Sequence, residues 1–149
     1  MSRILVINGP NLNNLGRRAA EHYGATTLPE IESAIVERGR ELGADVTCFQ
    51  SNHEGALVDF LQENAPAADG IVINPAALTT YGYSLADALR DTDAPIIEVH
   101  ISNIHAREEF RRHSIFSGIA VGQVVGFGWR GYLHAVEHLV RILGEDAPA

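Results

Sequence analysis

The pair best suited to acid–base chemistry is Glu98 and His100, which lie in the apolar run Ile96-Ile97-Glu98-Val99-His100. Side chains two positions apart in a strand point to the same face, so the carboxylate and the imidazole are expected to meet. A neighbouring carboxylate fixes the tautomer of an imidazole and equips it to donate a proton near neutral pH. Burial of a glutamate without a partner is costly. The pattern therefore favours a catalytic pair, with a purely structural pair as the alternative.

A second candidate is Tyr23, which lies with Arg17 and Arg18 in the glycine-containing segment 16–25. Long segments of this kind near the end of a strand often act as lids. A tyrosine acts as a base near neutral pH only when cations stabilise its phenolate, and the two arginines could supply them. From composition alone, a solvated loop is the simpler interpretation of this segment.

A further basic cluster contains Arg107, Arg111 and Arg112. Arg107 and Arg111 are four positions apart and share a face if the segment is helical. Guanidinium groups on one face could form a pocket for a carboxylate. The alternative is that they form salt bridges with Glu108 and Glu109 on the surface of a helix.

Amides, hydroxyls and imidazoles also follow four apolar runs of the chain. They occupy residues 8–14, 50–53, 74–75 and 98–103. Ligands of open parallel sheets bind beyond the carboxyl ends of the strands. The sequence therefore predicts a site there for a small, hydroxylated, anionic molecule, although any one of these residues could instead cap a helix or shape a turn.

The elements that must position these side chains alternate between short apolar runs and amphipathic segments. The apolar runs are residues 4–7, 46–49, 71–73 and 96–99, with a weaker run at 119–125. They are continuous rather than alternating, which is typical of a parallel sheet covered on both faces. Segments 28–42, 56–61, 85–89 and 132–143 follow a helical period. This order predicts an α/β fold with three layers, flavodoxin-like, in which a five-stranded parallel sheet of order 2-1-3-4-5 carries helices on both faces.

Two capping boxes predict where the first two helices begin. Thr27 and Glu30 form one box, and Ser51 and Glu54 form the other. Gly43 predicts the end of the first helix.

The composition bounds the classes of function. The chain has 149 residues, which suits one domain, and we expect a single catalytic domain over 1–144 with a frayed tail at 145–149. Its 19 acidic against 11 basic residues give a net charge of −8, which argues against nucleic acid or a membrane as the partner. All of the basic residues are arginines, so a lysine Schiff base is excluded.

Metal and secretion signals are missing from the sequence. Cys48 is the only cysteine, which excludes an intrachain disulfide and a cysteine-based metal cluster. No spacing of His, Asp and Glu suggests a metal site, and the first residues lack the pattern of a signal peptide. We therefore expect a cytoplasmic protein without a metal or a cofactor.

Four blocks of the sequence resemble the type II 3-dehydroquinate dehydratases, and the likeness extends over residues 3–143. The blocks are residues 8–13 (Asn-Gly-Pro-Asn-Leu-Asn), 50–55 (Gln-Ser-Asn-His-Glu-Gly), 71–75 (Ile-Val-Ile-Asn-Pro) and 98–111, which begins Glu-Val-His-Ile-Ser-Asn. The resemblance implies a flavodoxin-like fold and a hydro-lyase that removes water reversibly from 3-dehydroquinate by anti elimination through an enolate, giving 3-dehydroshikimate. It also implies a role in aromatic biosynthesis or quinate breakdown, and a homododecamer built as four trimers.

The resemblance further implies roles for individual residues. The implied catalytic residues are Tyr23 as the base, His100 as the acid, Glu98 orienting His100, Arg18 beside the phenolate, and Asn11 holding a water at the enolate oxygen. The implied substrate-binding residues are Asn74, Ile101 and Ser102 for the carboxylate, Arg111 for ring hydroxyls, Arg107 near the base, Ala76 and Thr80 in the adjoining segment, and Asp87 in the site of a neighbouring subunit.

The chain departs from the family in this adjoining segment. Where the family reads Gly-Ala-Tyr-Thr-His-Thr-Ser, residues 76–82 read Ala-Ala-Leu-Thr-Thr-Tyr-Gly, so that Thr80 replaces a histidine that bonds ring hydroxyls. Tyr81 or Tyr83 is expected to fill the gap. A same-fold lyase acting on a related polyhydroxy cyclic acid is therefore an alternative function.

A flavodoxin-like module that binds FMN or a phosphorylation signal without catalysis is the alternative from another class. The segment after the first apolar run lacks the Ser- and Thr-rich phosphate cradle of a flavodoxin, and the predicted strand ends carry asparagine rather than an acidic cluster. Both features argue against it.

Overall fold

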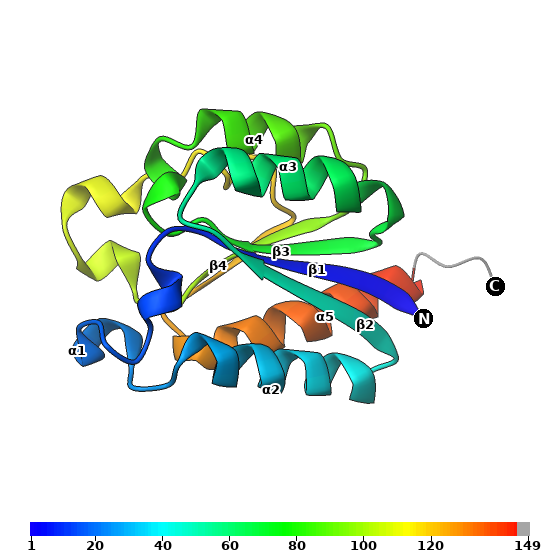
Figure 1. The fold of residues 1–149 in the computed structure, drawn as a ribbon, viewed down its shortest axis with the longest axis horizontal. Helices are drawn as coiled ribbons and strands as arrows, with labels where there is room; N and C mark the ends of the chain where they lie inside the picture. The colour runs from blue at the N-terminus through cyan, green and yellow to red at the C-terminus, as the bar shows by residue number, and fades with distance from the viewer. Residues whose placement is uncertain (146–149) are drawn as a thin grey trace.

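A parallel sheet organises the protein, and the computed structural model describes residues 1–145 (Figure 1). The strands are β1 (Ser2–Asn8), β2 (Ala44–Gln50), β3 (Gly70–Asn74), β4 (Ile96–His100) and β5 (Gly122–Val125). They pair in parallel in the order β2-β1-β3-β4-β5, which confirms the predicted flavodoxin-like arrangement. Of the tail expected at 145–149, residues 146–149 lie outside the described part.

Helices cover both faces of the sheet (Figure 1). Helices α2 (Leu28–Glu41) and α5 (Gly131–Glu145) pack on one face, and α3 (Glu54–Asn64) and α4 (Tyr83–Arg90) pack on the other. The short helix α1 (Ala20–Tyr23) and several 3-10 turns join these elements. The turns are η1 (Leu12–Asn14), η2 (Ala65–Ala67), η3 (Ala76–Thr80), η4 (Ile104–Ala106), η5 (Glu109–Arg112) and η6 (Gly128–Arg130).

The core consists of two apolar clusters, one on each side of the sheet. Ile31, Ile35 and Val136 belong to the cluster under α2 and α5, whereas Leu57 and Leu85 belong to the cluster under α3 and α4. Every residue of β3 and β4 is buried. The continuous apolar runs therefore reflect strands that are covered on both faces.

The predicted boundaries of α2 are confirmed. The side chain of Thr27 accepts a hydrogen bond from the Glu30 backbone N–H, and the Glu30 carboxylate accepts one from the Thr27 N–H at 3.2 Å. Beyond the helix, Gly43 adopts φ 80°, the left-handed conformation that often follows a helix end.

The second predicted capping box is wrong. Helix α3 begins after His53, and no side chain caps it. Ser51 Oγ instead accepts from the His53 N–H at 3.0 Å, and Glu54 Oε2 accepts from the Leu85 N–H of α4 at 3.0 Å. The extended backbone at His53 delays the helix past the register that the motif requires, which leaves Glu54 available to a neighbouring helix.

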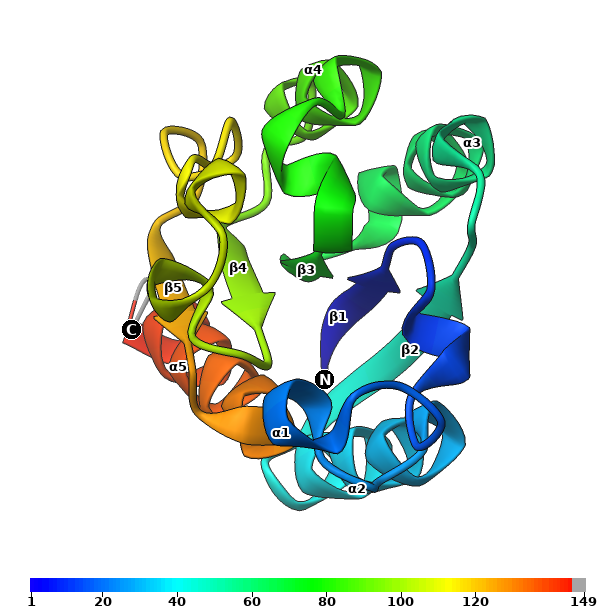
Figure 2. The same cartoon turned by 90° about the vertical axis from the view of Figure 1, so that its left-hand side faces the viewer.

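The carboxyl ends of the strands meet at one edge of the sheet, which faces the viewer in Figure 2. Helix α1 and the turns that follow β1, β3 and β4 surround this edge. None of the helices within residues 1–145 combines the length and the hydrophobicity that crossing a bilayer requires.

Candidate active site

A cavity of about 150 Å³ opens at the carboxyl edge of the sheet. Most of the predicted site residues line it: Asn11, Arg18, Tyr23, Asn74, Ala76, Thr80, His100, Ile101, Ser102, Arg107 and Arg111. Two lie elsewhere. Glu98 is fully buried behind His100, and Asp87 lies exposed on α4, where it pairs with Arg90 at 3.3 Å.

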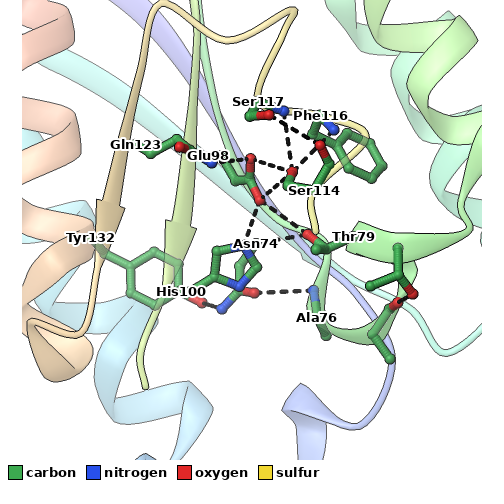
Figure 3. Close-up of polar contacts among 12 residues, drawn as sticks. Asn74, Ala76, Thr79, Glu98, His100, Ser114, Phe116, Ser117, Gln123 and Tyr132 are labelled. Atoms are coloured by element: carbon green, nitrogen blue, oxygen red, sulfur yellow. Dashed lines mark hydrogen bonds and ion pairs between the residues drawn. The ribbon is translucent and has the colours of Figure 1, made fainter. Parts of the chain in front are cut away.

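Glu98 and His100 form the contact that the strand geometry predicted. His100 Nε2 lies 2.5 Å from Glu98 Oε2, and the two side chains are almost wholly buried (Figure 3). Glu98 also accepts hydrogen bonds from Ser114 Oγ at 2.8 Å, Gln123 Nε2 at 2.9 Å and Thr79 Oγ1 at 3.0 Å. Each carboxylate oxygen therefore has at least two partners, which holds the group in place.

These partners also keep the carboxylate ionised. Burial raises the pKa of Glu98, but the hydrogen bond and the charge of His100 outweigh it together with the bonds from Ser114 and Gln123, so that the pKa falls below its ordinary value. Because Glu98 occupies Nε2, Nδ1 is the ring nitrogen of His100 that is left for a contact with a ligand. The imidazole is thus oriented from behind and exposed to the cavity on its other side.

Tyr23 receives two guanidinium groups on its phenolic oxygen. Arg18 Nη2 donates to it at 3.1 Å and Arg107 Nη1 at 2.7 Å, and the Arg18 guanidinium carbon lies 4.1 Å from the ring centroid. Arg17 is exposed. The solvated-loop interpretation of segment 16–25 is therefore wrong for Arg18 and Tyr23, since cation contacts draw the segment onto the cavity.

The segment that carries Arg107 and Arg111 is not one helix. Arg107 follows η4 and Arg111 lies in η5, so the condition for a shared helical face is not met, although both side chains line the cavity. Arg107 also donates to Ser102 Oγ at 3.2 Å. Arg111 Nε pairs with Glu108, as the salt-bridge alternative predicted.

Asn74, at the end of β3, uses both ends of its amide. Its Oδ1 accepts from the Ala76 N–H at 3.1 Å, and its Nδ2 donates to the Tyr132 hydroxyl at 2.9 Å (Figure 3). That hydroxyl donates to Asn8 Oδ1 at 2.6 Å. Burial raises the pKa of Tyr132, so the group stays a neutral hydroxyl. Ala76 adopts φ 54°, the left-handed region that favours glycine.

Thr80, at the position where the chain departs from the family, lines the cavity, but its hydroxyl has a partner within its own turn. Thr80 Oγ1 donates to the Ala77 carbonyl at 3.2 Å, so the hydroxyl turns back onto its own turn. The expectation that Tyr81 or Tyr83 fills the gap is wrong, because these side chains are 55% and 66% exposed and do not line the cavity. The backbone turns at Tyr81 and α4 begins at Tyr83, and both rings end up in solvent.

Several residues of the site have no signal in the sequence. Ser114 and Gln123 reach Glu98 only through tertiary packing, in which Gln123 of β5 is the register partner of Glu98. Thr79 precedes Thr80, the position at which the family has a histidine. Tyr132 follows the apolar period of α5. In residues 1–145 no group of three or more His, Cys, Asp and Glu side chains could hold a metal ion.

Comparisons with known proteins identify the family. The profile of the family described as Dehydroquinase class II matches residues 2–140. A 3-dehydroquinate dehydratase of Roseiflexus castenholzii is 55% identical over 143 residues, which cover 96% of this chain and 91% of that protein. One of Halothermothrix orenii is 50% identical, with 96% and 97% covered. The crystal structure of the type II dehydroquinase from Propionibacterium acnes superposes with a TM-score of 0.91 at 45% identity, covering 95% of this chain and 97% of that one. By its sequence, its sheet order and its structural likeness, the chain belongs to the class II dehydroquinase family.

Proposed function

We propose that the protein is a 3-dehydroquinate dehydratase, which removes water reversibly from 3-dehydroquinate to give 3-dehydroshikimate. One observation carries the proposal: a single cavity contains a tyrosine held by two arginines and a histidine held by a buried glutamate. An elimination through an enolate needs a base, an acid and stabilisation of the oxyanion between them.

Tyr23 acts as the base that takes the proton from C2 of the substrate. Arg18 and Arg107 place positive charge at the oxygen where the phenolate forms. Asn11, which adopts φ 70° on the cavity wall, holds a water against the enolate oxygen. His100 then gives its proton to the departing C1 hydroxyl, and Glu98 stabilises the imidazolium.

The substrate carboxylate binds at the ends of β3 and β4. The backbone N–H groups of Ile101 and Ser102 and the amide of Asn74 supply neutral donors there, and Arg111 contacts the ring hydroxyls. All proton transfers in this scheme use side chains of the protein, so the reaction proceeds without a metal or a cofactor. A lysine imine is excluded because the chain has no lysine.

The test is spectrophotometric and follows the ultraviolet absorbance of the conjugated enone product in the presence of a chelator. The wild type turns over, whereas Tyr23→Phe and His100→Ala each lower kcat by roughly 10²- to 10⁴-fold, the usual contribution of a general acid or base. Their melting temperatures stay close to the wild-type value. Near-wild-type kcat in either variant contradicts the role given to that residue.

Thr80 favours a second candidate, a lyase of the same fold that acts on a related polyhydroxy cyclic acid. Its hydroxyl proton is engaged by the Ala77 carbonyl. Comparison of wild type with Thr80→His on 3-dehydroquinate decides between the two. A gain of about tenfold or more in kcat/KM for the variant, the effect of one restored hydrogen bond of about 1.4 kcal/mol, favours the related substrate. An unchanged or lower value favours 3-dehydroquinate itself.

We also propose that the chain assembles into a homododecamer of four trimers, in which Asp87 reaches the site of a neighbouring subunit. Its support within the chain is that Asp87 is exposed on α4 and does not line the cavity of its own subunit.

A further inference from the structure

A buried tyrosine of α5 connects the ends of two neighbouring strands. Asn8 ends β1, Asn74 ends β3, and the two are register partners in the sheet. The hydroxyl of Tyr132 lies between them, at 2.6 Å from Asn8 Oδ1 and 2.9 Å from Asn74 Nδ2. Tyr132 and Asn8 are 0% exposed and Asn74 is 3% exposed. The three side chains therefore form a polar chain inside the core, behind the cavity wall.

This chain of hydrogen bonds has a fixed direction. It starts at the backbone N–H of Ala76, which can only donate and which occupies Asn74 Oδ1. Asn74 must then present its NH₂ group to Tyr132. The Tyr132 oxygen accepts this hydrogen bond, and the Tyr132 hydroxyl donates its own proton in a hydrogen bond to Asn8 Oδ1. If the Asn74 amide turned over, its NH₂ group would face the Ala76 N–H, donor against donor.

The amide of Asn74 consequently offers a hydrogen-bond donor, and not an acceptor, to the cavity. Its nitrogen carries two protons, and Tyr132 takes one of them. Asn74 lines the cavity, so the second proton is available to a ligand, while Oδ1 is engaged by the backbone.

We propose that Tyr132 is a positioning residue: it holds the Asn74 amide, whose orientation the Ala76 N–H sets, in place as a hydrogen-bond donor for the anionic group of the substrate. The inference rests on the proposed function, in which that group is the carboxylate of 3-dehydroquinate. An acceptor at this place would repel a carboxylate, so the binding of an anionic ligand depends on a donor that Tyr132 holds in place without touching the ligand.

The decisive variant is Tyr132→Phe, which removes the hydroxyl and keeps the ring. The Asn74 amide loses its partner at Nδ2 and can rotate away from the cavity. We expect KM to rise about tenfold, the effect of losing one hydrogen bond to a charged group, while kcat stays within about twofold. Loss of uniform binding has this signature, whereas general destabilisation of the core does not.

Leu139→Ala is the matched control. Leu139 is a fully buried residue of the same helix, and it packs against Gly70 at the opposite end of β3. The control variant should melt at a lower temperature with an unchanged KM. If it raises KM as much as Tyr132→Phe does, the effect comes from looser packing of α5 and the inference is overturned.

A double-mutant cycle tests whether Tyr132 acts through Asn74. Asn74→Ala alone should raise KM at least as much as Tyr132→Phe. In the Asn74→Ala background, Tyr132→Phe should lower the melting temperature further and leave KM where it is. Full additivity of the two effects on KM, or a wild-type KM in Tyr132→Phe, overturns the inference and leaves the proposed function intact.

A structure of the Tyr132→Phe variant separates this inference from the proposed function. If the wild type fails to turn over 3-dehydroquinate, the proposed function fails, and the orientation of the Asn74 amide still decides the inference. A rotated amide, or two orientations of it, supports the positioning role. An amide that keeps its bond to the Ala76 N–H in a single orientation overturns it.

Discussion

The backbone conformation of Ala76 shapes the site. Its φ of 54° lies in the left-handed region, where an L-residue with a Cβ atom costs about 1–2 kcal/mol. The conformation aims the Ala76 N–H at Asn74 Oδ1, the bond that orients the amide in the cavity wall. The strain therefore serves the geometry of the site rather than the stability of the chain.

Ala76→Gly should raise the free energy of unfolding by roughly 0.5–1 kcal/mol, because relief of the left-handed strain exceeds the added entropy of glycine in the unfolded chain. Urea denaturation measures the change. Ala77→Gly is the control: its φ is not positive, so the same exchange should lower the free energy of unfolding by about 0.5–1 kcal/mol. Equal shifts of the same sign in both variants contradict strain at Ala76.

A hydrogen bond between the Glu54 side chain of α3 and the backbone of α4 connects these two helices. Leu85 lies in the first turn of α4, whose N-cap residue, Gly82, offers no capping side chain. Glu54 of α3 accepts from the Leu85 N–H, and the negative charge sits where a helix N-terminus favours it. The contact therefore fixes the start of α4 directly after η3, which forms part of the cavity wall.

Glu54→Ala should lower the free energy of unfolding by about 1 kcal/mol, the usual cost of removing a cap, and should raise KM because η3 loses its anchor. Glu54→Gln, which keeps an acceptor oxygen, should lose less than half as much. Thr27→Ala removes a local capping box on α2 and serves as the control. It should cost a similar free energy in urea denaturation while KM stays the same, so a KM effect shared by both variants counts against the anchoring role.

The starts of α2 and α3 show how far the sequence predicts the fold. The strand order and the capping of α2 follow from continuous apolar runs and from a motif whose members contact each other. The same motif fails at Ser51 and Glu54 because the helix begins only after His53, and the Glu54 carboxylate then accepts from the distant Leu85 N–H. Local patterns are reliable where the local contact wins and fail where tertiary packing supplies a better one.

The site follows the same logic. The contact between Glu98 and His100 is predictable because two residues on one strand face fix each other's position. Ser114 and Gln123 reach the same carboxylate from 16 and 25 residues away, and only the folded sheet brings them there. Tyr132 carries no signal at all, because a buried tyrosine on an apolar helix face is indistinguishable from a packing residue until its hydroxyl finds a partner.

The stability of the folded chain should depend on acid pH through Glu98. Its pKa in the folded state is lower than the ordinary value of about 4.5 that applies in the unfolded chain, so the unfolded state binds the proton first. The stabilisation by ionised Glu98 is complete above about pH 4.5, and it is lost as the pH falls from there through the folded pKa. The acid limb of stability thus reports on the buried group that holds His100.

Glu98→Gln should flatten the fall in unfolding free energy below about pH 4.5, measured by urea denaturation at a series of pH values. Its stability at neutral pH should be lower, because the buried hydrogen bonds of the carboxylate are replaced imperfectly. Glu37→Gln removes an exposed carboxylate paired with Arg40 and should leave the acid limb almost unchanged. An acid limb of wild-type slope in Glu98→Gln assigns the pH dependence to other carboxylates.

The proposed assembly makes a prediction that only mixed subunits can test. If Asp87 serves the site of a neighbouring subunit, Asp87→Ala and His100→Ala should each be poorly active alone, with wild-type mass by light scattering. Mixed oligomers, prepared by unfolding and refolding the two variants together, should regain activity. A site with intact His100 then meets a neighbour with intact Asp87.

Tyr23→Phe mixed with His100→Ala provides the control for this experiment. Tyr23 and His100 line the cavity of one chain, so no arrangement of these two variants places both intact residues in the same site. Recovery in the first mixture and none in the second assigns Asp87 to a neighbouring site. Recovery in neither mixture, or a monomeric mass for the wild type, removes Asp87 from the site, because a side chain outside the cavity of its own chain can act only in an assembly.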